Sequence, residues 1–394
     1  MYEDLHEPLV RHLNSCRYIS VMADSSTDTS VRDLELVYVR HIKEGRPVNT
    51  YMATQELDHV NAQGHLDCID DAVSDNGLPD WKDKLVGFGS DGASVMVGQV
   101  SGVVGLLKVE IPYLMDIHCL AHKLELGAMD AIKDQAAMKD VFDILNGIYK
   151  QYHYSPKAWR DLKTVADLME LEVLKPVNLK GTRWLPHLSR ALSVLLKSYP
   201  VLVRHLEHTI TDGKSSPTMI GRARQIVTQM KHFKSLQFMF FMCDVLDVLS
   251  CLSCKFQENK VTISECIEAL ETAFLSLREL RVEHGRHLRG FLAESVNGTF
   301  HDVELTAYND ASRNAFNGIK VRVLDSVHNH LDNRFSSLET EEAKACAKIL
   351  AVKDWPREAD QLPQFGNQAI DILIGHFRPV LLRNGCDVEV ARYC

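Results

Sequence analysis

Residues 84–98, KLVGFGSDGASVMVG, constrain the fold of this chain more than any other stretch. Their apolar run with two glycines is typical of a buried strand, and it ends at Asp91, directly before the turn-forming Gly92. Residues 18–23, YISVMA, form a second strand-like run that leads into Asp24. Two carboxylates at the ends of two core strands suit a divalent metal ion, because hard cations prefer oxygen ligands on rigid elements.

The first part of the chain predicts a mixed sheet. Strands are expected at 18–23, 34–42, 48–55, 84–89 and 114–118, with helices at 61–73 and 100–110. The first three strands form an antiparallel meander. The order βββαβαβ is similar to that of a ribonuclease H-like core, in which the first and fourth strands are neighbours. Asp24 and Asp91 are therefore expected to lie side by side.

After residue 122 the apolar positions recur at helical spacing. Long helices are expected over residues 157–174 and 225–256, and Thr262 and Glu265 have the spacing of a capping box. The predicted fold class is α/β plus all-α, a mixed sheet interrupted by a large helical insertion. The expected domains are 1–122 for the first part of the core, 123–355 for the insertion and 356–394 for a return toward the core.

Composition limits the classes of function. With 394 residues, a formal net charge of −9 and a pI of about 6.1, the chain is not a generally basic DNA-coating protein, although a local basic face remains compatible with this balance. Ten cysteines without a regular framework favour free thiols in a reducing compartment. The most apolar run, 236–252, contains Asp244 and Asp247, which favours a buried helix over a membrane span. No membrane association is expected.

Four short motifs follow one another along the chain. They are Asp24-Ser-Ser-Thr-Asp28, Ser90-Asp-Gly-Ala93, Cys119-Leu-Ala-His122 and Arg183-Trp184. With these motifs the chain resembles the hAT superfamily of DNA transposases and the host proteins domesticated from them. The resemblance implies a ribonuclease H-like catalytic core with a large helical insertion. It also implies a nuclear protein, and an additional location in the cytoplasm stays open. The sequence does not identify its protein partners.

The resemblance assigns roles to the two acids. In the family the first two acids bind magnesium, and Asp24 and Asp91 match those catalytic positions. The third acid is a glutamate in a Ser-Glu-Arg motif, which this sequence does not contain. We therefore expect Mg²⁺ to be an ancestral cofactor and the chain to be catalytically inactive. The alternative is an active transposase, a magnesium-dependent polynucleotidyl transferase. We also expect the family's amino-terminal zinc-finger module and its dimerisation segment to be missing.

Other interpretations of these residues stay open. Asp24 and Asp91 could each cap a turn after a strand, a common use of aspartate, and Asp28 is better explained by the turn. Cys119 and His122 could supply half of a zinc site, which needs a second pair of ligands. The only other pair in the sequence with CxxC or CxxH spacing is Cys251-Leu-Ser-Cys254. Its place in an apolar helix favours buried thiols, so zinc is not expected and Cys119 and His122 are taken as structural motif residues.

A one-sided distribution of charge surrounds the last motif. Residues 175–204 and 214–234 contain basic but no acidic residues. Basic side chains attract phosphates, and an exposed Trp184 would offer a flat face to an unstacked base, a use that the resemblance also implies. The alternative is a tryptophan in the core beside a solvated basic face. The nucleic-acid-binding residues expected beside Trp184 are Lys180, Arg183 and Arg190. We expect DNA binding to be weak and carried by the helical region.

Overall fold

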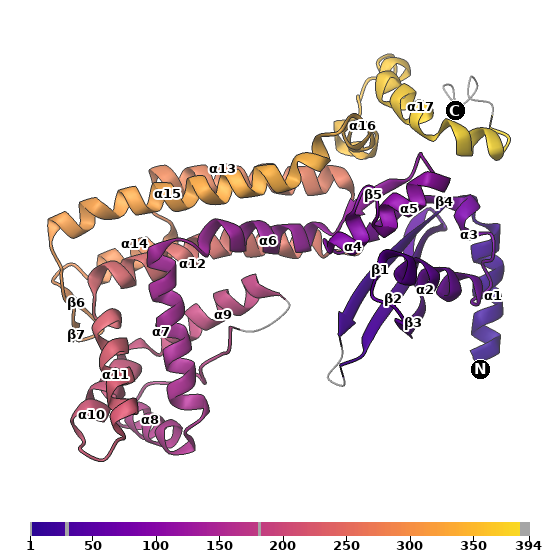
Figure 1. Cartoon of the computed structure of the whole chain (residues 1–394). Helices are drawn as coiled ribbons and strands as arrows, with labels where there is room; N and C mark the ends of the chain where they lie inside the picture. The colour runs from indigo at the N-terminus through magenta and orange to yellow at the C-terminus, as the bar shows by residue number, and fades with distance from the viewer. Residues whose placement is uncertain (1, 28–30, 180–182, 387–394) are drawn as a thin grey trace. The chain divides into compact units, whose positions relative to one another are not determined.

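The computed structural model describes residues 2–27, 31–179 and 183–386 and contains two compact units (Figure 1). The first unit consists of Met1–Lys123, Glu258–Ile267 and Phe335–Cys394. The second consists of Leu124–Gln257 and Glu268–Arg334. The chain therefore combines a mixed α/β unit with a helical one. Because each unit is discontinuous in sequence, the chain passes between them more than once.

A five-stranded mixed sheet forms the centre of the first unit. Its strands are β1 (Ile19–Thr27), β2 (Asp33–Lys43), β3 (Arg46–Glu56), β4 (Leu85–Ser90) and β5 (Met115–His118), in the spatial order β3-β2-β1-β4-β5. The pairs β1–β2 and β2–β3 are antiparallel, whereas β1–β4 and β4–β5 are parallel. The expected adjacency of the first and fourth strands is confirmed, since β4 pairs directly with β1.

Helices cover this sheet and complete its core. The helices of the first unit are α1 (Tyr2–Ser15), α2 (Ala62–Ser74), α3 (Trp81–Lys84), α4 (Ser94–Val97), α5 (Val103–Glu110), α16 (Glu341–Leu350) and α17 (Asn367–Arg383). Helix α2 packs against β2 and β3. Alternate residues of β1 are buried, which places Val21 in one core cluster with Leu13 of α1 and Val380 of α17. Helix α1 was not predicted from the sequence.

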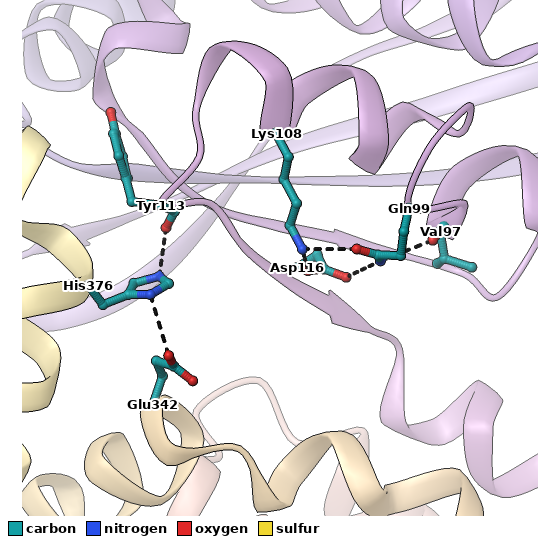
Figure 2. A network of polar contacts seen from close by, with 7 residues as sticks. All are labelled: Val97, Gln99, Lys108, Tyr113, Asp116, Glu342 and His376. Carbon is teal, nitrogen blue, oxygen red and sulfur yellow. Dashed lines mark hydrogen bonds and ion pairs between the residues drawn. The ribbon is translucent and has the colours of Figure 1, made fainter.

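The carboxy-terminal helices belong to the first unit. Figure 2 shows His376 of α17, whose Nε2 lies 2.8 Å from the carbonyl oxygen of Tyr113, while its Nδ1 lies 3.7 Å from the carboxylate of Glu342 on α16. The same view shows Lys108 of α5 paired with Asp116 of β5. Because α16 packs against α17, the second unit ends at Arg334, ahead of the boundary at residue 355 that the helical pattern suggested.

The second unit is helical apart from one short hairpin in its described part. The hairpin consists of β6 (Thr299–Phe300) and β7 (Val303–Glu304). The helices are α7 (Ala136–His153), α8 (Pro156–Leu168), α9 (Trp184–Lys197), α10 (Tyr199–Thr211), α11 (Pro217–Met230), α12 (Phe233–Phe256) and α14 (Arg286–Glu294). Helices α6 (Leu120–Ile132), α13 (Ile263–Val282) and α15 (Asp310–Phe335) also contribute most of their residues to it.

Two helix boundaries differ from the sequence prediction, and one is confirmed. The single helix expected over 225–256 is wrong: α11 ends and α12 begins at residues 231–232, where Thr306 exchanges backbone hydrogen bonds with Lys231 and Phe233 at 2.8 and 3.0 Å. A backbone that pairs with a neighbouring segment leaves the helical hydrogen-bond ladder. Helix α8 ends at Leu168 rather than 174. The capping box before α13 is confirmed, because Thr262 and Glu265 bond each other's backbone N–H.

Helix α12 is the long apolar helix of the second unit. By length and composition it could cross a membrane, and 61 % of its most apolar window is buried inside the structure. Asp244 lies on this helix, only 4 % exposed. Its two carboxylate oxygens accept backbone N–H bonds from His287 and Leu288 at 2.9 and 3.0 Å. The buried acid thus caps the first turn of α14 from a neighbouring helix.

We expect Asp244→Ala to lower the free energy of unfolding by about 2–4 kcal/mol, because two buried N–H groups lose their acceptor. Asp244→Asn keeps one acceptor oxygen and should lose less. Urea unfolding followed by circular dichroism measures both values. The matched control is Asp140→Asn on the exposed face of α7, which should change stability little. Equal losses for all three variants would contradict the capping role.

Candidate functional site

Two aspartates occupy matching positions at the carboxyl edge of the sheet. In the parallel pair β1–β4, Ala23 is the partner of Ser90. The residue after each of these two partners is an acid: Asp24 on β1 and Asp91 directly after β4. Parallel neighbours present their carboxyl ends at one edge of a sheet. The strand register therefore aligns the backbone positions of the two acids that the sequence singled out.

The environments of the two acids differ. Asp24 is exposed and Asp91 is half-buried. One carboxylate oxygen of Asp91 accepts the backbone N–H of Ala93 at 3.1 Å, so this acid does cap the turn that follows its strand. Capping uses one lone pair of one oxygen, which leaves further acceptor capacity on the same carboxylate. The turn-capping interpretation and a metal-binding interpretation are thus compatible at Asp91.

A histidine that the sequence analysis overlooked lies at the same edge. His118 ends β5 and is the register partner of Ser90. Its imidazole packs over Gly92, where an added Cβ would lie 2.2 Å from the ring, so only glycine leaves room for it. The ring of His122 lies 5.5 Å from that of His118, between centroids. The signal in the sequence was a histidine as the last residue of the strand predicted at 114–118.

The cysteine pairs are placed differently from expectation. Cys119 is exposed, and its backbone N–H bonds the carbonyl of Ser90 at 2.8 Å, extending the pairing of β4 with β5. Cys251 and Cys254, expected to be buried thiols, are both exposed. The apolar stretch that contains them forms a helix whose last turns bury only one face. The prediction of buried thiols at these two positions is therefore wrong.

Asp24 and Asp91 both carry the kind of side chain that a magnesium ion binds. Carboxylates on adjacent strands supply the hard oxygen ligands that Mg²⁺ prefers, and Mg²⁺ is commonly bound by one or two carboxylates together with waters. Within the described part of the chain, no third His, Cys, Asp or Glu side chain forms a group of three with them at mutual ligand-atom distances within 4.8 Å. The strand register aligns the backbone positions of these two acids only.

The first basic run lines a groove in the second unit. A cavity of about 700 Å³ opens between α9, α12 and the segment before α9. Three exposed cations lie along it, Lys175, Arg190 and Lys197. None of the described residues that line it is acidic. The remaining lining residues are Leu174, Val177, Pro186, Ser189, Ser193, Val194, Ser250, Ser253, Cys254 and Gln257.

Helical spacing explains how the groove forms. The lining residues of α9 recur every three or four positions, which puts them on one face of the helix. Those of α12 do the same in its last turns, and several residues on both faces are serines, whose small side chains leave space. Arg183, at the start of α9, donates to Oε1 of Gln257 at 2.5 Å, and Gln257 bonds Oγ of Ser253 at 2.8 Å. These hydrogen bonds hold the Arg183 side chain against the residues that line the groove.

Trp184 lies in the core of the second unit. It is 9 % exposed and makes an edge contact with Phe142 at 6.3 Å between ring centroids. The neighbouring backbone N–H of Leu185 donates to the buried carboxylate of Glu125 at 2.7 Å. The exposed stacking face expected from the sequence is wrong at this position, because the apolar face of α9 turns the indole inward. Lys180, the remaining expected contact, lies outside the described residues.

These two features are the acidic edge (Asp24 and Asp91) and the basic groove (the cavity lined by Lys175, Arg190 and Lys197). No family model matches this chain. The acidic edge presents carboxylates. The basic groove presents three cations and serine hydroxyls, with no acid among its described lining residues.

The burial of Trp184 makes a prediction about stability. Trp184→Ala should lower the free energy of unfolding by about 3–5 kcal/mol, the range for truncating a buried aromatic residue. Trp184→Phe should lose clearly less, because an apolar ring still fills most of the space. Urea unfolding gives both values. An unchanged free energy of unfolding for Trp184→Ala would contradict the core position of Trp184 and would indicate an exposed indole.

Proposed function

We propose that this chain is a nucleic-acid-binding nuclear protein derived from a hAT transposase and without strand-transfer activity. In this proposal the sheet unit is a ribonuclease H-like core and the helical unit corresponds to the family's insertion. The strand order β3-β2-β1-β4-β5, with a parallel β1–β4 pair, supports the first assignment. The four sequence motifs in family order support the origin.

The observation that carries the binding function is the basic groove. Its three cations come from one acid-free segment of sequence, and their charge contrasts with the net charge of −9 of the whole chain. At physiological salt the repulsion from distant acidic residues is screened beyond about 8 Å, so a local group of cations decides whether a phosphate binds. Serine hydroxyls add neutral hydrogen-bonding groups for a sugar-phosphate backbone.

We favour a single strand over a duplex as the ligand. The groove lies between two helix faces and the segment before α9, so a single backbone could follow it while its cations contact the phosphates. With Trp184 buried, affinity would rest mainly on phosphate contacts. Binding of this kind has little sequence preference and depends steeply on salt. DNA is the ligand implied by the resemblance.

We expect the triple variant Lys175→Ala, Arg190→Ala, Lys197→Ala to bind labelled single-stranded DNA more weakly than wild type. It should also flatten the slope of log affinity against log salt by about two units, because each phosphate contact to a single strand contributes about 0.7. Fluorescence anisotropy at four salt concentrations measures both quantities.

The matched control removes three exposed cations from α8 of the same unit, by Lys157→Ala, Arg160→Ala and Lys163→Ala. Both triple variants change the net charge equally, so a general electrostatic effect lowers affinity in both. If the DNA binds specifically in the groove, only the groove variant loses affinity. Wild-type affinity and slope in the groove variant would refute nucleic-acid binding at this groove and favour a protein-interaction role.

A second candidate function is that of an active magnesium-dependent transposase. The observation that favours it is the register that places Asp24 and Asp91 at corresponding positions of neighbouring strands. In a polynucleotidyl transferase such acids hold metal ions that activate water or a 3′-hydroxyl for attack on a phosphodiester. Two acids without the third glutamate argue for binding of metal without catalysis, which is the reason we place this function second.

We expect Mn²⁺, used as a paramagnetic substitute for Mg²⁺, to bind weakly, with both Asp24→Asn and Asp91→Asn lowering the affinity. The reason is the loss of one charged oxygen ligand from a two-acid site. Electron paramagnetic resonance of free Mn²⁺ measures the binding, and Asp75→Asn at the exposed end of α2 is the control. No cleavage or joining of hairpin-forming DNA ends is expected. Metal-dependent cleavage that disappears in Asp91→Asn would overturn the first proposal in favour of the second.

A further inference from the structure

Two histidines and one cysteine converge at the amino-terminal side of the first unit. His12 on α1 and Cys16 just after it are four residues apart, which puts both on one side of the helix end. His41 lies on β2. Nε2 of His12 is 3.2 Å from Nδ1 of His41 and 3.8 Å from Sγ of Cys16. All three ligand atoms lie within 4.8 Å of one another.

We propose that His12, Cys16 and His41 form a binding site for a divalent transition-metal ion, with Zn²⁺ as its first occupant. A tetrahedral zinc ion has Zn–N bonds of about 2.05 Å and Zn–S bonds of about 2.3 Å, which separates two nitrogen ligands by about 3.3 Å and nitrogen from sulfur by about 3.6 Å. The observed 3.2 and 3.8 Å match these edges closely. Small side-chain movements bring all three atoms into range.

The site has the second layer of contacts that holds a metal ligand in place. Nε2 of His41 lies 2.9 Å from Oγ1 of Thr50 on β3, and both residues are buried, at 3 % and 9 % exposed. Metal-binding histidines commonly use the ring nitrogen opposite the metal for such a hydrogen bond. This contact orients the ring so that Nδ1 faces His12.

A hydrogen-bonded chain without metal is the competing explanation. In it, His12 Nε2–H donates to His41 Nδ1, and His41 Nε2–H donates to Thr50. These hydrogen bonds use Nε2 of His12 and both ring nitrogens of His41. They do not require Cys16, whose thiol donates to the carbonyl of His12 at 3.4 Å. Metals bind the thiolate, so a metal ion at this site must displace the thiol proton of Cys16. The involvement of the thiol therefore separates the two explanations.

The ligand set also selects the metal. One thiolate and two imidazoles are softer than carboxylates, so they favour Zn²⁺ and related ions over Mg²⁺. His12 and Cys16 are half-buried, which leaves the fourth position open to water. A metal held here joins α1 to β2 and stabilises the first unit, because the unfolded chain does not preform the site. The site is independent of the acidic edge, which is built from hard oxygen ligands.

The test uses the whole chain, stripped of metal by a chelator and kept reduced. Co²⁺ as a spectroscopic substitute should bind in one equivalent and give a thiolate-to-metal charge-transfer band with intense tetrahedral ligand-field bands. Cys16→Ser should abolish the charge-transfer band, and His41→Gln should weaken binding at least tenfold, as expected for loss of a ligand. Zn²⁺ should raise the thermal unfolding temperature of wild type and not of Cys16→Ser.

Two controls make the result decisive. The double variant Cys251→Ser, Cys254→Ser removes the exposed cysteine pair of the second unit and should keep the full cobalt spectrum. His12→Gln changes a half-buried side chain, so it tests the site even if His41→Gln folds poorly by circular dichroism. A wild-type chain without the charge-transfer band would overturn the proposal. So would a band that survives Cys16→Ser and disappears in the Cys251/Cys254 variant.

Discussion

The parallel pairing of β1 with β4 sets the positions of Asp24 and Asp91 in the first unit. Ala23 lies opposite Ser90, and the residue that follows each of them in the sequence is an aspartate. A shift by one residue would turn alternate side chains to the other face and separate the acids. Gly87 allows this close register, because a Cβ there would lie 2.7 Å from the Ser20 hydroxyl. The pairing of β5 with β4 then adds His118 to the same edge.

The two units carry different kinds of polar feature, each complete within its own unit. The acidic edge collects hard oxygen ligands at the end of a sheet, and the basic groove collects cations and hydroxyls along two helix faces. The cluster of His12, Cys16 and His41 is a third type, with softer ligands between a helix and a strand. Because their ligand chemistries differ, substitutions in one should leave the others intact, which makes the three proposals separable by experiment.

The sequence was a poor guide wherever burial depended on the partner of a helix face. Trp184 begins an amphipathic helix, and its neighbours in sequence include several cations, yet the indole packs against Phe142. Cys251 and Cys254 lie in the most apolar helix, yet both are exposed. Periodicity places a residue on one side of its own helix and does not say which part of that side another helix covers. The break between α11 and α12 has a similar cause, a backbone contact from Thr306.

By itself, the sequence determined the mixed sheet followed by helices, the neighbouring positions of the first and fourth strands, the position of Asp91 directly after its strand and the capping box at Thr262. These follow from local composition and spacing. The sequence pattern ended the first strand before Asp24, whereas β1 continues to Thr27. Only the tertiary structure decided that His118 packs over Gly92, that His12 meets His41, and that α9 and α12 enclose a groove. Such meetings depend on how distant segments pack, because short-range patterns describe a residue's own element and not the partner across it.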